Sequence, residues 1–290
     1  PEGRDVGEII EQLKADPRVD LAQPMHLFET LASGYDDPYV DLQSAAVDLA
    51  VADAHRLATG VDVLVAVVDT AVDADHPDLR GRVALERDLV ASRRKPSQAE
   101  VHGTAVAGVI ASTANNQEGI VGVAPAVRVA ALRACWPLEG ADSRSQCSSF
   151  TLARALETAL AIDAAVINLS LAGPPDPLLA RLLDAAIGRN VVVVAAAPAP
   201  ESGTTFPASH QGVLVAQAAS APVGTLSRYR LPAPAVDILT TIPGAGYGFF
   251  SGTSLAAAHL SGVPVRKLKL AAFALTGGSA ALAGIMYASR

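Results

Sequence analysis

The chain has 290 residues, enough for one large domain or two modest ones. Half of its residues are hydrophobic, only 4% are aromatic, and the formal net charge at pH 7 is −7. The hydrophobic content supports a sizeable core, and an acidic balance without any basic cluster argues against a nucleic-acid partner.

The first 34 residues are predicted to carry one helix and one short strand. Apolar residues at positions 6, 9, 10 and 13 have the spacing of a helix over residues 6–14. The pair Asp16-Pro17 ends that helix, and residues 19–24 are predicted to form a short strand. The chain starts with neither an initiator Met nor a signal peptide, so we expect it to follow a cleaved segment.

From residue 61 onward, short valine-rich runs alternate with segments of helical character. Strands are predicted at residues 62–68, 127–133, 164–169, 190–196 and 213–217, and helices at residues 102–112, 150–162, 176–188 and from 254 onward. Residues 236–239 and 247–250 are predicted to be two further short strands. Strands that alternate with helices form a parallel sheet with right-handed crossovers, so the predicted fold class is α/β.

Two residues at the ends of these elements are candidates for chemistry. The strand at residues 62–68 stops at Asp69, on the carboxyl edge where open α/β sheets place their sites. A turn aspartate that only ends the strand is the alternative. His102 opens the next predicted helix, where its charge is influenced by the helix end. An incidental surface histidine is the alternative.

Ser254 is the third candidate. It stands directly before residues 255–258, a strong helix-forming run, and so close to a helix N-terminus. Backbone N–H groups there can bind an oxyanion while the serine hydroxyl attacks a carbonyl. The alternative is a serine that only caps the helix.

Residues 65–70, 102–108 and 251–259 resemble the three active-site motifs of the subtilase family of serine proteases, in that family's chain order Asp, His, Ser. The resemblance implies a subtilisin-like three-layer sandwich, with a central mainly parallel sheet and helices on both faces. It also implies that Ser254 attacks the scissile carbonyl, His102 transfers the proton and Asp69 orients His102. Ala71, Leu255 and Ala258 depart from the family's usual Gly, Met and Pro without removing a reactive group.

The resemblance also predicts the domain organisation. Residues 35–265 are expected to form the catalytic domain, with residues 35–60 as a linker and a first helix that Gly60 ends. Residues 1–34 resemble the end of a subtilase propeptide, which folds with the enzyme and inhibits it. The alternative is an N-terminal extension packed on the domain.

One departure from the family concerns the oxyanion hole. After the strand at residues 190–196 come Ala197, Pro198 and Ala199, and the last two stand where the family has Gly and an Asn whose side chain donates to the oxyanion. Alanine has no side-chain donor, and loss of one such donor lowers kcat by about 10²–10³. We therefore predict a weakened oxyanion hole, formed by the Ser254 N–H with help from the Thr253 hydroxyl.

The resemblance further implies a set of substrate-binding residues. The predicted set is Ser170, Leu171, Ala172, Gly173, Ala196, Ala197 and Pro198. Backbone edges at residues 171–173 and 148–150 are expected to pair with an extended substrate. Asn168 matches a strand position before this pocket and is predicted to be a buried structural amide.

The chain has two cysteines. Cys135 and Cys147 bracket a polar segment, which fits a local disulfide bond in an exported protein. A pair of buried free thiols is the alternative.

Residues 266–290 are predicted to form a C-terminal helix or tail. Arg266, Lys267 and Lys269 precede residues 270–288, an uncharged run long enough to span a bilayer but rich in Gly, Ala and Ser. The basic flank would also hold the catalytic domain in the cytoplasm, which conflicts with an exported protease. We therefore favour a helix or tail over a membrane anchor.

Together these patterns predict a secreted or periplasmic serine endopeptidase whose partners are polypeptide substrates and its own propeptide. The chemistry needs no cofactor and no metal ion, and the sequence leaves a structural calcium ion open. The alternative is a protease fold kept as a binding or scaffold protein with little or no catalysis. The changes at Pro198 and Ala199 favour that alternative, and the complete triad opposes it.

Overall fold

The structure is a computed structural model that describes residues 5–26, 34–90, 100–138, 145–199, 202–203, 205–220 and 229–263. The chain divides into two compact units, residues 1–33 and 34–290.

The first unit contains helix α1 (Val6–Lys14), as the sequence predicts. The Asp5 carboxylate caps this helix by accepting a hydrogen bond from the Gly7 N–H at 2.9 Å, and none of the helix residues is buried. The strand predicted at residues 19–24 is wrong, since residues 19–26 form no strand. A strand needs a neighbour for its backbone hydrogen bonds, and the described residues of this unit provide none.

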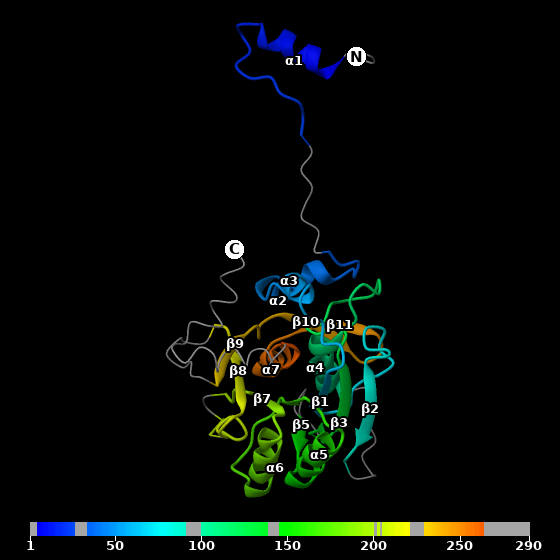
Figure 1. The fold of residues 1–290 in the computed structure, drawn as a ribbon, viewed down its shortest axis with the longest axis vertical. Helices are drawn as coiled ribbons and strands as arrows, with labels where there is room; N and C mark the ends of the chain where they lie inside the picture. Colours follow the sequence, from blue (N-terminus) through cyan, green and yellow to red (C-terminus); the bar gives the residue numbers. More distant parts are fainter. Residues whose placement is uncertain are drawn as a thin grey trace. The chain divides into compact units, whose positions relative to one another are not determined.

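The second unit is built on a seven-stranded sheet whose neighbouring strands are all parallel (Figure 1). In spatial order the strands are β2 (Val83–Asp88), β3 (Arg128–Arg133), β1 (Leu64–Asp69), β6 (Val166–Leu169), β7 (Val192–Ala196), β8 (Leu214–Ala218) and β9 (Arg230–Ala233). The five inner strands were all predicted from their apolar runs. The two edge strands were not, because their sequences mix polar, charged and proline residues.

Helices cover both faces of this sheet, which confirms the three-layer α/β fold. Successive residues of β1 point to opposite faces. Val65 and Val67 pack into the core that includes helices α4 (Val101–Ala111) and α7 (Thr253–Gly262). Ala66 and Val68 pack into the core that includes α5 (Ser149–Ala161) and α6 (Pro177–Gly188). Figure 1 shows α5 and α6 side by side.

Two small antiparallel hairpins lie outside the main sheet. Strands β4 (Cys135–Pro137) and β5 (Ser145–Cys147) form the first. Strands β10 (Ile238–Ile242) and β11 (Gly246–Phe250) form the second, and they overlap the two short strands predicted before Ser254.

The segment before β1 differs from the prediction of a single helix that ends at Gly60. It contains a short 3₁₀ helix, η1 (Val40–Leu42), and two five-residue helices, α2 (Ser44–Asp48) and α3 (Val51–His55). Ala50 separates α2 from α3 because it adopts a left-handed conformation, with φ 48°. Gly60, with φ 86°, lies in the loop after α3 and caps no helix.

Candidate active site

The three candidate residues lie at the ends of three elements of the second unit. Asp69 is the last residue of β1, His102 is the second residue of α4, and Ser254 is the second residue of α7. Helices α4 and α7 pack against each other on one face of the sheet. Asp69 therefore does more than end its strand, and His102 is not an incidental surface histidine, because the two side chains are partners.

Asp69 and His102 are joined by a hydrogen bond. His102 Nδ1 lies 2.8 Å from Asp69 Oδ1 and 2.9 Å from Oδ2. A carboxylate accepts, so Nδ1 carries the hydrogen and Nε2 is left as the basic nitrogen. Asp69 is buried, and the side chain of His102 is 36% exposed. The negative charge of Asp69 raises the pKa of His102, and this outweighs the opposing effect of burial.

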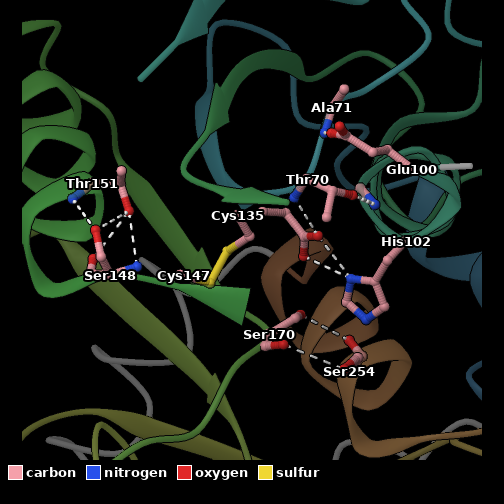
Figure 2. The surroundings of a disulfide bond; sticks show 12 residues. Thr70, Ala71, Glu100, His102, Cys135, Cys147, Ser148, Thr151, Ser170 and Ser254 are labelled. Carbon is pink, nitrogen blue, oxygen red and sulfur yellow. Dashed lines mark hydrogen bonds and ion pairs between the residues drawn. A yellow bond between two sulfur atoms is a disulfide. The ribbon is translucent and has the colours of Figure 1, made fainter. Parts of the chain in front are cut away.

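The end of β1 is bonded directly to the start of α4 (Figure 2). The Gly103 N–H donates to Thr70 Oγ1 at 2.9 Å, and the Ala71 N–H donates to Glu100 Oε2 at 2.9 Å. Gly103 has no room for a side chain, since a Cβ atom there would lie 2.5 Å from the Thr70 carbonyl oxygen. Close backbone contact at this point therefore requires glycine.

Glu100 is a residue of this site that the sequence analysis does not identify. Its carboxylate is buried and forms a bidentate ion pair with Arg133. Arg133 Nε donates to Glu100 Oε2 at 2.8 Å, and Arg133 Nη2 donates to Glu100 Oε1 at 2.7 Å. The available signal was a charged residue, Arg133, at the end of an apolar strand, because a buried charge needs a partner.

Ser254 does not cap its helix. The N-cap of α7 is Gly252, which has no side chain to do so, and this excludes the capping alternative. The Ser254 hydroxyl lies 3.5 Å from the Ser170 carbonyl oxygen, and the Ser170 hydroxyl oxygen lies 3.2 Å from the Ser254 carbonyl oxygen. Figure 2 shows these contacts and the His102 ring in the same view. Among the bonds of the described residues, none joins Ser254 to His102, so that link of the triad stays a prediction.

The side chains of Thr253 and Ala199, near the predicted oxyanion hole, offer no free hydrogen-bond donor. The Thr253 hydroxyl donates to the Ala197 carbonyl oxygen at 2.8 Å, so its single proton is already bonded. Ala199, which the sequence predicts at the position of the family asparagine, is exposed, and its side chain can donate nothing. The Ser254 N–H lies in the first turn of α7, where backbone N–H groups lack acceptors within the helix.

Asn168 is the structural amide that the sequence predicts. It is fully buried, donates to the Ser261 hydroxyl at 2.9 Å and accepts from the Ser170 hydroxyl at 2.9 Å. Its amide is therefore occupied by other residues of the core.

A pocket of about 430 Å³ opens beside Asp69 and His102. Of the predicted substrate-binding residues, Ser170, Leu171, Ala172 and Gly173 line it, and Ala196, Ala197 and Pro198 do not. The β4–β5 hairpin and three apolar side chains, Leu152, Leu179 and Phe206, form much of the remaining wall. Val68, Ser149, Pro174 and Asp176 complete it. The Gly173 N–H already donates to the Phe206 carbonyl oxygen at 2.8 Å, so that edge is partly paired within the chain.

The predicted pairing of residues 148–150 with substrate is wrong. Ser148 is the N-cap of α5, and Ser149 and Phe150 are its first two residues. Ser148 and Thr151 form a capping box, in which each side chain accepts the other's backbone N–H. Backbone in a helix is not available as a strand edge.

The disulfide bond between Cys135 and Cys147 is confirmed. The two residues are paired across β4 and β5, and both line the pocket. The disulfide thus fixes the hairpin that forms one wall of the pocket (Figure 2).

The sequence analysis also raised a metal ion and a membrane-spanning segment, which can be examined only among the described residues. Within those residues there is no cluster of three His, Cys, Asp or Glu side chains that could hold a metal ion. No helix among the described residues is both long and apolar enough to cross a membrane. The uncharged run at residues 270–288 lies outside the described residues.

Known proteins resemble this chain over most of its length. The model of the subtilase family matches residues 60–271. The chain is 35% identical over 271 residues to a thermophilic serine proteinase of Bacillus sp. (strain AK1), covering 89% of this chain and 65% of that protein. It is 33% identical over 269 residues to subtilisin NAT of Bacillus subtilis subsp. natto, covering 87% of this chain and 66% of that protein.

The structural comparison points the same way. The crystal structure of fervidolysin from Fervidobacterium pennivorans, described as a keratinolytic enzyme related to subtilisin, superposes with a TM-score of 0.71 at 26% identity. The match covers 83% of this chain and 42% of fervidolysin, and the chain spans just under two thirds of the two sequence relatives. On the family model and these relatives, the chain belongs to the subtilase family.

Proposed function

We propose that this chain is a serine endopeptidase in which Ser254 is the nucleophile, His102 the general base and then acid, and Asp69 the residue that orients His102. The hydrogen bond from His102 Nδ1 to the buried Asp69 carboxylate supports this assignment most strongly. It fixes the tautomer in which Nε2 can take a proton from a serine hydroxyl.

In the proposed reaction, the Ser254 hydroxyl attacks the scissile carbonyl and its proton passes to His102 Nε2. The imidazolium then protonates the leaving amine, and water hydrolyses the acyl-enzyme by the same route. The negative charge on Asp69 stabilises the imidazolium, in keeping with the raised pKa of His102. The Ser254 N–H stabilises the oxyanion.

The pocket beside Asp69 and His102 supports a polypeptide substrate. Its walls include residues 170–174 and the disulfide-bonded hairpin. An extended peptide could lie in the pocket and bond to the backbone there, with a side chain against Leu152, Leu179 and Phe206.

The oxyanion hole is proposed to be weak. Ala199 has no donor, and the Thr253 hydroxyl is bonded to Ala197. The expected result is a slow protease, since one missing donor lowers kcat by about 10²–10³.

Labelling with a fluorophosphonate tests the function directly. The wild type should be labelled at Ser254 and should hydrolyse an unstructured protein substrate, and Ser254→Ala should do neither. A folded wild type that binds such a substrate, yet is neither labelled nor active, would favour the alternative, a binding or scaffold protein. The occupied Thr253 hydroxyl and Ala199 are the observations that favour this alternative.

We further propose an extracytoplasmic location, either secreted or periplasmic, and a role for residues 1–34 as the end of the enzyme's own propeptide. The disulfide bond supports the location, since such bonds persist in oxidising compartments. Adding a peptide of residues 1–34 to a chain that starts at residue 35 tests the second role. Inhibition by the peptide would support it, and unchanged activity would speak against it.

A further inference from the structure

Three segments that meet at the Asp69–His102 pair are joined by one buried carboxylate. Glu100 precedes His102 by two residues, and Ala71 follows Asp69 by two residues. The Ala71 N–H donates to Glu100 Oε2 at 2.9 Å, so this bond links the end of β1 to the start of α4 (Figure 2).

The third segment is the end of β3. Arg133 is the register partner of Asp69 in the adjacent parallel strand. Its side chain, which is 4% exposed, holds Glu100 by two parallel hydrogen bonds, and its remaining nitrogen donates to Asp88 at 2.8 Å. The hydrogen bonds to Glu100, and after them the bond to Asp88 and the charges of both carboxylates, raise the pKa of Arg133, so the guanidinium stays charged.

A bidentate pair of this kind fixes both the distance and the angle between the two side chains, since the planar guanidinium matches the plane of the carboxylate. A buried ion pair is weak evidence for stability alone, because apolar residues of similar size often replace one without loss. The value of this pair therefore lies in the geometry that it imposes on the segments it joins.

We propose that Glu100, held by Arg133, is a positioning residue that sets the start of α4 against the end of β1 and so fixes the hydrogen bond between His102 and Asp69. The kinetic part of its test rests on the proposed protease function, and the spectroscopic part does not.

The test compares Glu100→Ala and Glu100→Gln with the wild type, by two readouts. The first is the downfield proton resonance of His102 Nδ1–H, assigned by its absence in His102→Ala. The second is kcat and KM on an unstructured protein substrate. Glu100→Ala should shift or broaden the resonance and lower kcat roughly 10- to 100-fold with little change in KM, because a small misplacement of a catalytic group has that effect.

Glu100→Gln is the conservative variant. Its side-chain oxygen can still accept the Ala71 N–H, but its amide group faces the Arg133 donors in place of the second oxygen. It should therefore recover part of the resonance position and part of kcat. If Glu100→Ala does not fold, Glu100→Gln carries the test alone, and a wild-type resonance in it would overturn the proposal.

Asp37→Asn is the matched control. Asp37 is also a buried carboxylate that accepts backbone N–H groups, from Asn115 at 2.8 Å and Asn116 at 3.3 Å. In the folded control both readouts should stay at wild-type values. The proposal fails if Glu100→Ala keeps the wild-type resonance, or if Asp37→Asn changes kcat and the resonance as much as Glu100→Ala does.

The two hypotheses fail in different ways. A wild type that neither reacts with a fluorophosphonate nor cleaves the substrate would overturn the proposed function. The resonance would still decide the positioning proposal in that case, because it reports on the bond between His102 and Asp69 without any turnover.

Discussion

The two halves of the site differ in how completely they are built. On the Asp69–His102 half, the charged groups are paired and the backbone around them is bonded across β1, β3 and α4. On the Ser254 half, the serine hydroxyl makes one long contact, and the Thr253 hydroxyl is bonded elsewhere. In the proposed reaction, the proton-transfer groups are thus held in advance, whereas oxyanion stabilisation depends on backbone N–H groups.

This difference separates two contributions to rate that enzymes usually combine. A preorganised base speeds proton transfer, and preorganised donors stabilise the charge that develops on the carbonyl oxygen. If the proposed function is right, each contribution can be changed in this chain without touching the other. The changes below are ordered from the largest expected effect to the smallest.

Asp69→Asn should disrupt the Asp69–His102 half of the site. An asparagine holds His102 in the wrong tautomer, and in serine proteases with this triad that change lowers kcat by about 10⁴. The measurement is kcat on a peptide substrate, with Ser254→Ala as the baseline for contaminating activity. A loss of less than tenfold would mean that the Asp69–His102 bond does not act in catalysis.

Ala199→Asn should add an oxyanion donor to the Ser254 half of the site. A side-chain amide at this position should raise kcat by at most about 10²–10³, with less effect on KM, because an oxyanion donor acts mainly in the transition state. Ala199→Leu, which is similar in size to asparagine but has no donor, is the control. Equal kcat values for the two variants would show that residue 199 does not face the oxyanion.

Removing the disulfide should affect the pocket wall and neither half of the reacting apparatus. Cys135→Ser/Cys147→Ser opens a loop with a sequence separation of 12 residues. On the entropic model this costs about 3 kcal/mol of stability, measured by denaturant unfolding. KM should rise as the hairpin loosens, and kcat of the folded fraction should stay the same. A fall in kcat with KM unchanged would assign the hairpin to the reacting apparatus instead.

The smallest expected effect is on the pH dependence, which reports on the pKa of His102 alone. Because Asp69 raises the pKa of His102, kcat/KM should fall as pH decreases through a value above that of an ordinary histidine. The same shift means that the folded state holds this proton more tightly, so the pair stabilises the fold at low pH and loses that effect as pH rises through the folded-state pKa. In Asp69→Asn, an NMR titration of the His102 ring should give a lower pKa. An unchanged pKa would assign the shift to another charge.

The sequence predicted most of the fold, because the inner strands are apolar runs and the long helices have regular periodicity. It missed β2, whose charged and exposed residues read as a loop, and it proposed a strand at residues 19–24 that has no partner. Both errors have one physical origin. A strand is stabilised by its neighbours, and the neighbours are not visible in a local pattern.

The site follows the same rule. Asp69, His102 and Ser254 were found because each carries its motif in the residues beside it. Glu100 and Arg133 were not found, because their contact depends on the register of β1 against β3. The partner of the Thr253 hydroxyl, Ala197, lies directly after β7, far from Thr253 in the sequence, and no local pattern indicates it.

Helix α7 gives Ser254, the proposed nucleophile, an enclosed physical setting. Residues 255–261 are all buried, and the helix packs against α4 and against four strands of the sheet. We expect the hydrogen-bonded backbone amides of so enclosed a helix to exchange with solvent only when the whole domain unfolds. Ser254 is therefore attached to one of the last parts of the molecule to open. Heat should abolish its reactivity at the melting temperature of the domain, with no earlier loss from a loosened loop.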